Sequence, residues 1–310
     1  MEVVRSWGAF RPPPPAGCAV ALGNFDGLHR GHRRILRQLT LEAARRRLPA
    51  YVLTFTPHPE KFFGSSRILM IQTLEQRLAG LARFNLDGVI VAPFRRALAS
   101  LPPWGFVRSV LRGRLRARLV VVGADFRFGR GRRGDADGLA RMGRRAGFEV
   151  RAVPHLRRRG RIVSSSFIRA CLAEGDIGLA NDFLGRPYAI EGDVVAGSGR
   201  GRGMGFATAN IETPNEIVPQ GVYLTSLRLG GADRPSVTNV GLRPTFGPSR
   251  PAIETHILDW EGDLYGASVG LAFLVKLREE RVFSGPEALA AQIRRDIEAA
   301  RRFFGRGRRL

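Results

Sequence analysis

The chain has 310 residues, of which 44% are hydrophobic, and its formal net charge is +23 at pH 7. This length suits about two globular domains, and no apolar run approaches the roughly 18 residues of a membrane span. Lysine occurs only at Lys61 and Lys276, so arginine supplies nearly all of the positive charge, spread from Arg5 to Arg309. A compositional bias explains this spread better than a specific site, so we expect neither a membrane protein nor a specific nucleic-acid binder.

The two cysteines, Cys18 and Cys171, are too few for a disulfide framework and wrongly spaced for a zinc site. The N-terminal segment, with its run from Pro12 to Pro15, lacks the basic, apolar and small-residue succession of a signal peptide. We therefore expect a soluble protein of the cytoplasm. Nothing in the sequence indicates an oligomeric state.

Short apolar runs alternate with helical patterns from Ala19 to about Leu184. Helices are expected over Arg33 to Arg46 and over Leu74 to Phe84, the second with Thr73 as its N-cap. This alternation predicts a doubly wound parallel sheet whose ligands bind at the carboxyl ends of the strands. The expected strands are Cys18 to Leu22, Tyr51 to Phe55, Val89 to Ala92, Leu119 to Gly123 and Val150 to Val153.

The most informative stretch, Gly23 to His32, directly follows the first expected strand and reads Gly-Asn-Phe-Asp-Gly-Leu-His-Arg-Gly-His. His29 and His32 are three residues apart at a helix start, so their imidazoles share one face beside the positive end of the helix dipole. Gly27 and Gly31 would let ligand atoms approach the backbone. We expect a nucleotide triphosphate here; the alternative is an ordinary helix start with two surface histidines.

A loop at the end of the second expected strand reads Thr-Phe-Thr-Pro-His-Pro-Glu over residues 54–60. Pro57 and Pro59 stiffen this loop and hold His58 outward. A histidine between prolines is also common in surface turns. His58 therefore becomes a candidate site residue only together with the histidine pair.

The loop after the fourth expected strand reads Gly-Ala-Asp-Phe-Arg-Phe-Gly over residues 123–129. It offers the carboxylate of Asp125 beside two aromatic rings. Phe126 and Phe128 either face a ligand or pack into the core, and the sequence leaves both open. For Asp125 we favour a functional role.

The stretch from Ser164 to Arg169 reads Ser-Ser-Ser-Phe-Ile-Arg, where the fifth expected strand is followed by a helix. A serine there caps the helix, and Ser164 and Ser165 can hold phosphate oxygens together with backbone N–H groups. Arg169, one turn on, can add a bidentate contact to the same triphosphate. A plain N-cap is the competing interpretation.

After Gly185 the pattern changes to short alternating strands without intervening helices, which predicts a small antiparallel barrel. A helix from Glu287 to about Phe304 closes the chain. We expect an α/β domain over residues 1–184 and a β domain over residues 185–310. The expected barrel strands are Ile190 to Val195, Gly221 to Leu229, Ser236 to Val240, Glu254 to Leu258 and Val269 to Leu277.

Residues 197–210 read Gly-Ser-Gly-Arg-Gly-Arg-Gly-Met-Gly-Phe-Ala-Thr-Ala-Asn. The alternating glycines predict a flap whose N–H groups fold over phosphates, although composition alone also fits a flexible loop. Thr208 and Asn210, two apart in an extended segment, place two neutral oxygen ligands on one side, which suits Mg²⁺. The expected flap residues are Gly197, Gly199, Arg202, Gly203 and Gly205.

Motif by motif, the chain resembles the bacterial bifunctional riboflavin kinase/FAD synthetases. The Gly-Asn-Phe-Asp-Gly opening, the Pro-His-Pro loop, the Gly-x-Asp-Phe-x-Phe-Gly loop and the Ser-Ser-x-x-Ile-Arg helix start match its adenylyltransferase half. That half resembles the wider nucleotidyltransferases, which implies a Rossmann-like fold. Residues 219–223, 239–246 and 254–259 resemble its riboflavin kinase half. The resemblance covers roughly residues 18–304.

The resemblance implies two activities, riboflavin plus Mg-ATP to FMN, and FMN plus ATP to FAD with release of pyrophosphate. Glu254 is then the general base toward the riboflavin hydroxyl, and His29 and His32 contact the ATP phosphates. Asp125 and its neighbours, with His58, face the flavin. The implied ATP-binding residues of the adenylyltransferase are Gly23, Asn24, Phe25, Asp26, Gly31, Ser164, Ser165 and Arg169.

One departure concerns Ala207, which stands where the family typically has the proline of Pro-Thr-Ala-Asn. Losing the ring frees φ and loosens the loop that carries Thr208 and Asn210. One alternative is therefore an FMN adenylyltransferase with an inactive flavin-binding barrel. Another is a basic nucleic-acid-binding protein in which these motifs are incidental. The alternative to a general base at Glu254 is an ordinary strand residue that faces solvent.

Overall fold

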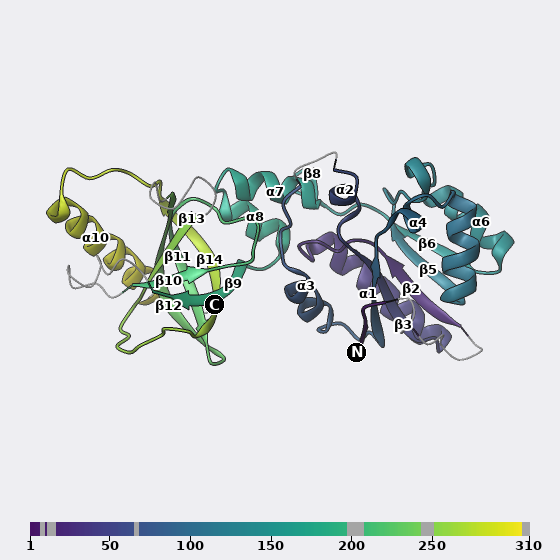
Figure 1. Ribbon diagram of the computed structural model, residues 1–310, viewed down its shortest axis with the longest axis horizontal. Coiled ribbons are helices and arrows are strands. Elements are labelled where there is room, and N and C mark those ends of the chain that lie inside the picture. Colours follow the sequence, from purple (N-terminus) through teal and green to yellow (C-terminus); the bar gives the residue numbers. More distant parts are fainter. Residues whose placement is uncertain (7–9, 11–16, 65–67, 197–207, 243–250, 306–310) are drawn as a thin grey trace. The chain divides into compact units, whose positions relative to one another are not determined.

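The computed structural model describes residues 1–6, 10, 17–64, 68–196, 208–242 and 251–305. The chain divides into two compact units, of which the first comprises Met1–Leu69 and Thr73–Ser165. The second comprises Met70–Gln72 and Ser166–Leu310. Figure 1 shows a sheet with helices in the first unit and a barrel in the second.

Six strands form one parallel sheet in the described part of the first unit, in the order β1-β4-β3-β2-β5-β6. The doubly wound parallel sheet expected from the sequence is therefore confirmed. The strands are β1 Glu2–Val4, β2 Cys18–Leu22, β3 Ala50–Thr56, β4 Gly88–Pro93, β5 Ala117–Gly123 and β6 Glu149–Val153.

Strand β2 is buried along its whole length because helices cover both faces of the sheet. Its alternate residues belong to two different apolar clusters. Cys18, Val20 and Leu22 join the cluster that includes Phe106, whereas Ala19 and Ala21 join the cluster around α1. An uninterrupted apolar run therefore identifies this strand, and its carboxyl end opens into the loop that begins at Gly23.

The two helices that the apolar periodicity predicts in the first unit are present, with shifted ends. Helix α1 (Arg30–Arg46) begins three residues earlier than expected. Helix α3 (Leu74–Leu81) has Thr73 as N-cap, as expected, in a capping box closed by Gln76. The remaining helices are α2 Pro59–Phe62, α4 Arg96–Ala99, α5 Pro103–Phe106, a π-helix Val107–Arg114, a 3₁₀ turn Arg130–Arg132 and α6 Ala136–Ala146.

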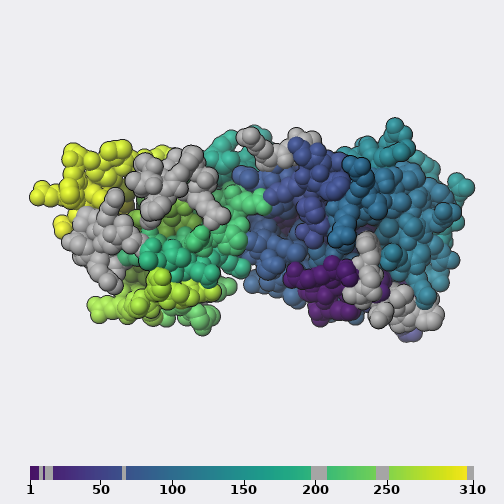
Figure 2. All heavy atoms as spheres, in the orientation of Figure 1, coloured from purple at the N-terminus to yellow at the C-terminus, as the bar shows by residue number. Residues whose placement is uncertain are grey.

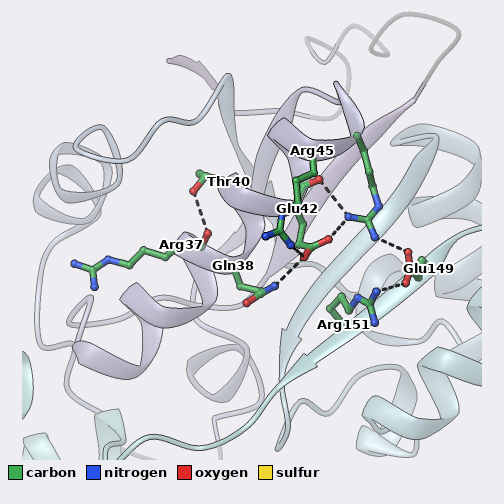
Figure 3. Close-up of polar contacts among 8 residues, drawn as sticks. Arg37, Gln38, Thr40, Glu42, Arg45, Glu149 and Arg151 are labelled. Carbon is green, nitrogen blue, oxygen red and sulfur yellow. Dashed lines mark hydrogen bonds and ion pairs between the residues drawn. The ribbon is translucent and has the colours of Figure 1, made fainter.

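An ion-pair network joins the C-terminal half of α1 to the edge strand β6 (Figure 3). Glu42 accepts hydrogen bonds from Arg46 and Arg45, and Arg46 also bonds Glu149 at 2.8 Å. Arg151 pairs with the other oxygen of Glu149 at 2.7 Å. The hydrogen bond from Arg46 lowers the pKa of the Glu42 carboxyl, so the network is charged at neutral pH.

No pattern in the sequence predicts β1, because three residues are too few to show a period. It pairs with β4 in the register Glu2↔Gly88 to Val4↔Ile90. It forms the outer edge of the sheet, and Figure 2 shows the N-terminal residues, in purple, on the surface. The pairing is a tertiary contact, so only the folded sheet reveals this strand.

The described part of the second unit contains a closed antiparallel barrel in the order β10-β13-β12-β11-β14-β9, as expected. Its interior holds the rings of Tyr188, Tyr223 and Phe273, all fully buried. Val222 and Val237 on the outer face pack against the long C-terminal helix. The strands are β9 Tyr188–Val195, β10 Ala209–Glu212, β11 Gly221–Leu229, β12 Ala232–Leu242, β13 Pro251–Ile257 and β14 Ser268–Arg278.

The remaining elements are the short antiparallel strands β7 (Arg157–Arg158) and β8 (Arg161–Ile162) and the helices α7 (Ser165–Ala173), α8 (Ile177–Leu184) and α10 (Pro286–Gly305). Helix α8 is fastened to the barrel through Asn181, which donates to the carbonyl of Phe273 and accepts from the N–H of Tyr188. The compact units thus divide at Ser165. A functional boundary at residue 184 stays a prediction. Among the described residues, no helix is long and apolar enough to cross a membrane.

Candidate active sites

The loop between β2 and α1 is strained and held from several sides. Phe25, Gly27 and Leu28 have φ values of 53°, 84° and 41°, a region that non-glycine residues rarely adopt. The N–H of Gly23 donates to the carbonyl of Leu53. Strain of this kind persists only where the surroundings over-determine it, and it is concentrated at functional sites. The sequence motif therefore coincides with an unusual backbone.

The structure brings His29 and His32 together at the start of α1. His29 is the N-cap, and its Nδ1 accepts the N–H of His32 at 3.2 Å. The two rings stack with centroids 3.6 Å apart, and Phe25 lies edge-on to His32. Because Nδ1 of His29 is an acceptor, the neutral ring carries its proton on Nε2. The ring of His29 is 5% exposed and lies at the helix N-terminus, where anions are favoured.

Gly27 and Gly31 of this segment are each required for a different structural reason. Gly27 has a positive φ, which a side chain would strain. A Cβ on Gly31 would stand 3.1 Å from the ring of His29. Gly31 therefore makes room for the stacked ring of His29. The close approach of ligand atoms to Gly27 and Gly31 stays a prediction.

His58 lies beside the same loop. It is the N-cap of α2, and its Nδ1 accepts the N–H of Glu60 at 3.2 Å. Its Nε2 lies 2.8 Å from the carboxamide of Asn24. Because Nδ1 accepts, neutral His58 is protonated at Nε2, and the Asn24 carboxamide must turn its oxygen to that atom. The amide N–H₂ of Asn24 then faces away from His58.

Ser165 joins the start of α7 to the same loop. Its hydroxyl donates to the carbonyl of Asp26 at 2.9 Å. Asp26 itself is buried, whereas Ser164 and Arg169 are half-buried. The serine segment thus contributes a structural contact to the loop. The phosphate contacts expected for Ser164, Ser165 and Arg169 stay a prediction.

Three of the residues expected on the flavin side lie in the loop after β5, and they differ in exposure. Asp125 is exposed and Phe126 is half-buried. Phe128 is only 7% exposed, and its ring lies 5.6 Å from those of Phe106 and Phe126. Phe128 is thus a core residue, the alternative that the sequence left open. A flavin role for this loop stays a prediction, and it falls on Phe126 and Asp125 more than on Phe128.

An aromatic cluster that the sequence reasoning missed follows His58. The rings of Phe62, Phe63 and Phe94 lie edge to face with centroids 5.3 to 6.0 Å apart. Phe63 is 59% exposed. The signal available in the sequence was the Phe62-Phe63 pair directly behind the Pro-His-Pro loop.

In the barrel, Glu254 of β13 is the register partner of Asn210 on β10 and of Asn239 on β12. Directly opposite residues share a face, with Cβ atoms about 5 Å apart. The three side chains therefore form one row, and each is half-buried. Asn239 was not singled out from the sequence, because only the strand register places it beside Glu254.

This row lies on the outer face of the barrel. The chain neighbours Thr238 and Thr255 are fully buried in the interior, and strand residues alternate between faces. Thr208 is exposed and directly precedes β10. The expected flap residues Gly197, Gly199, Arg202, Gly203 and Gly205, and also Ala207, lie outside the described residues.

The comparisons with known proteins match both halves of the chain. A family model described as FAD synthetase matches residues 12–167, and one described as riboflavin kinase matches residues 184–304. A bifunctional riboflavin kinase/FMN adenylyltransferase from Escherichia coli strain K12 is 38% identical, with 98% of each chain covered. The chain belongs to this bifunctional family. A relative from Pseudomonas fluorescens with the same description is 39% identical, with 97% of each chain covered.

A solved structure described as a macrolide-efflux protein from Streptococcus pneumoniae shares the fold. It is 27% identical with a TM-score of 0.88, and the match covers 96% of this chain and 98% of that one. The riboflavin kinase match over residues 184–304 favours the bifunctional interpretation over an adenylyltransferase with an inactive barrel. Because the motifs belong to family models that match both halves, they are not incidental, as the alternative of a basic nucleic-acid-binding protein would require.

Proposed function

We propose that the second unit phosphorylates riboflavin with ATP to give FMN, and that the first unit transfers the adenylyl group of a second ATP to FMN. The products of the second step are FAD and pyrophosphate. The observation that carries the proposal is the stacked pair His29 and His32 at the N-terminus of α1, directly after the carboxyl end of the central strand β2. This is where an open α/β sheet binds its ligand.

Adenylyl transfer needs alignment and neutralised charge more than covalent help. An FMN phosphate oxygen attacks the α-phosphorus of ATP, and the bond to pyrophosphate breaks. We assign the phosphate contacts to His29, His32 and the N-terminus of α1, and we add Arg169 from its place in the Ser-Ser-x-x-Ile-Arg motif. Gly23 to Asp26 form the wall of the same site. These groups stabilise the charge that develops on the phosphate oxygens.

Kinase chemistry is assigned to the row around Glu254. Its carboxylate takes the proton of the riboflavin hydroxyl as the hydroxyl oxygen attacks the γ-phosphorus of ATP; the bond from the γ-phosphorus to the β,γ-bridging oxygen breaks, and ADP leaves. Asn210 shares its row, and Thr208 stands just before the same strand, so the donors are oxygens of the kind that Mg²⁺ prefers. Thr208 and Asn210 would hold Mg²⁺, which screens the phosphate charge when bound. Asn239 flanks Glu254 on the other side, from β12.

On the flavin side of the adenylyltransferase we assign His58, Asp125 and Phe126. The exposed rings beyond His58, Phe62 and Phe63, offer a surface on which an aromatic ring system stacks. We place the functional boundary at residue 184. Since both reactions consume ATP, we assign the protein to the cytoplasm.

The two active sites should be separable. Glu254→Gln keeps the size of the side chain but removes the base, so FMN formation from riboflavin should fall at least about 100-fold while FAD formation from supplied FMN is kept. His32→Ala should do the reverse. Chromatographic separation of riboflavin, FMN and FAD after incubation with ATP and Mg²⁺ measures both products.

Circular dichroism and thermal unfolding of each variant control for folding. Loss of both activities in a folded Glu254→Gln or a folded His32→Ala protein would contradict the division of labour. Absence of FMN from the wild-type incubation, with FAD still formed from FMN, would instead indicate an inactive barrel.

A further inference from the structure

Three carbonyl groups of the loop between β2 and α1 accept hydrogen bonds from side chains outside the loop. The carbonyl of Asn24 accepts from Arg77, that of Asp26 from Ser165, and that of Leu28 from Arg33. The donors come from α3, α7 and α1 respectively. Every second peptide plane of the loop is thus held in a set orientation.

The opposite edge of each held peptide carries an N–H group. In a planar trans peptide the C=O and the following N–H point in opposite directions, and these peptide bonds are trans. The N–H groups of Phe25, Gly27 and His29 therefore point away from the three donors. Backbone N–H groups in a loop that enters the left-handed region are suited to bind anions. Each side-chain donor sets the direction of the N–H group on the peptide that it holds.

Arg77 is the least expected of the three donors. It is 5% exposed, and its Nη1 lies 2.6 Å from the carbonyl oxygen of Asn24. The same atom donates to the hydroxyl of Thr54 at 3.3 Å, and that hydroxyl donates to the Asn24 carbonyl at 3.1 Å. The three groups form a closed triangle around one carbonyl oxygen.

Burying this guanidinium costs free energy, because a charged group is removed from water. A purely structural role would not require a charged side chain here. Burial lowers the pKa of Arg77, and the nearby charge of Asp26 acts in the opposite direction. Its Nε is buried without a hydrogen-bond partner among the described residues. An apolar side chain in the core would avoid both penalties. What the guanidinium adds to the hydroxyl of Thr54 is a charged donor to the Asn24 carbonyl.

We propose that Arg77 is a positioning residue of the adenylyltransferase: it fixes the Asn24 carbonyl and so aims the Phe25 N–H and the Asn24 side chain at the triphosphate of ATP. This inference rests on the proposed ATP site. The Asn24 carboxamide is held at its far end by His58, so both ends of that residue are set by groups from other elements. Arg77 acts through Asn24 and touches no substrate itself.

The test compares Arg77→Met with Arg77→Lys. Methionine fills the space but donates no hydrogen bond, so kcat/KM for ATP should fall about 100-fold, with a raised KM for ATP, the order expected for a misplaced binding group. KM for FMN should not change. Lysine restores one charged donor and should recover part of the loss. Titration with a non-hydrolysable ATP analogue checks binding without turnover.

Leu81→Ala is the matched control, because Leu81 is buried one turn further on α3 and carries no polar group. It should lower the melting temperature and leave KM for ATP unchanged. If Arg77→Met fails to fold, Thr54→Val removes one corner of the triangle with little change of shape and should raise KM for ATP in the same direction.

Equal effects of Arg77→Met and Leu81→Ala on KM for ATP would overturn the inference, as would an unchanged KM for ATP in folded Arg77→Met or Thr54→Val. A wild-type protein that makes no FAD from FMN and ATP would overturn the proposed function instead. A wild-type protein that makes FAD but is insensitive to Arg77 would overturn only the positioning role.

Discussion

A chain of buried hydroxyl groups inside the barrel supports the strands that carry Glu254 and Asn239. Thr238 lies at its centre, 2.7 Å from the hydroxyl of Thr225 and 2.9 Å from that of Thr255. Thr225 also bonds Ser236 at 2.8 Å. All four residues are fully buried. Thr238 precedes Asn239, and Thr255 follows Glu254, so the row on the outer face depends on this interior pairing.

Thr238→Val keeps the shape of the side chain and breaks both hydrogen bonds. Thr225 keeps Ser236, so this loss costs about 1 kcal/mol. The buried hydroxyl of Thr255 loses its hydrogen bond to Thr238, which costs about 2 kcal/mol. The added methyl group returns about 1 kcal/mol. We therefore expect a net loss of about 2 kcal/mol in the free energy of unfolding of the barrel.

The double variant Thr238→Val/Thr255→Val tests this reasoning. Removing both hydroxyls leaves no orphan at Thr255, so the double variant should be more stable than Thr238→Val alone by about 1 to 2 kcal/mol. Thr255→Val alone should cost less than Thr238→Val, because Thr238 then keeps its bond to Thr225.

Hydrogen-exchange mass spectrometry at increasing urea is the suitable assay, because it reads peptides of β11, β12 and β13 separately from the first unit. A single unfolding curve for a protein with two compact units would mix their transitions. If the double variant loses as much stability as the sum of the two single variants, the hydroxyl chain does not act as a unit.

Two further outcomes can be measured on the same protein. Burial raises the pKa of the Cys18 thiol to about 12, above the roughly 8.5 of an unfolded chain. Keeping the Cys18 thiol protonated therefore stabilises the folded protein below about pH 8.5, and this stabilisation is lost as the pH rises toward 12. Iodoacetamide should modify Cys18 only after denaturation. Fast labelling of the native protein would refute this. Asp296→Ala removes the carboxylate that accepts from Arg278 at 2.8 Å, which leaves a half-buried guanidinium uncompensated. We expect a loss of about 3 kcal/mol and faster hydrogen exchange in α10 than in the conservative variant Asp296→Asn; equal exchange in both would contradict the pairing.

Local patterns in the sequence were sufficient to predict the main elements. The apolar run Cys18 to Leu22, the Thr73 N-cap and the periodicity of the last helix all depend on residues within a few positions of one another. The motifs at strand ends followed, because the carboxyl ends of parallel strands meet at one edge. The match of both halves to the riboflavin kinase and FAD synthetase families agrees with those motifs.

Contacts between distant segments could not be read in the same way. β1 is a strand only because β4 offers it a partner, and Asn239 joins Glu254 only through the barrel register. Phe128 and Phe126 have the same residue type and neighbouring positions, yet one is buried and the other half-buried. Sequence spacing does not distinguish them, since burial depends on what packs from other elements.

The sequence by itself determined which residues could bind phosphate or take a proton, because that chemistry resides in the side chains and their local spacing. The tertiary structure decided how those groups are aimed. Arg77 looks like a surface arginine on an amphipathic helix, but it is buried against the carbonyl of Asn24, 53 positions earlier in the chain. Hydrogen bonds of this kind join groups whose distance is set by the packing of helices on the sheet. No local pattern encodes that distance.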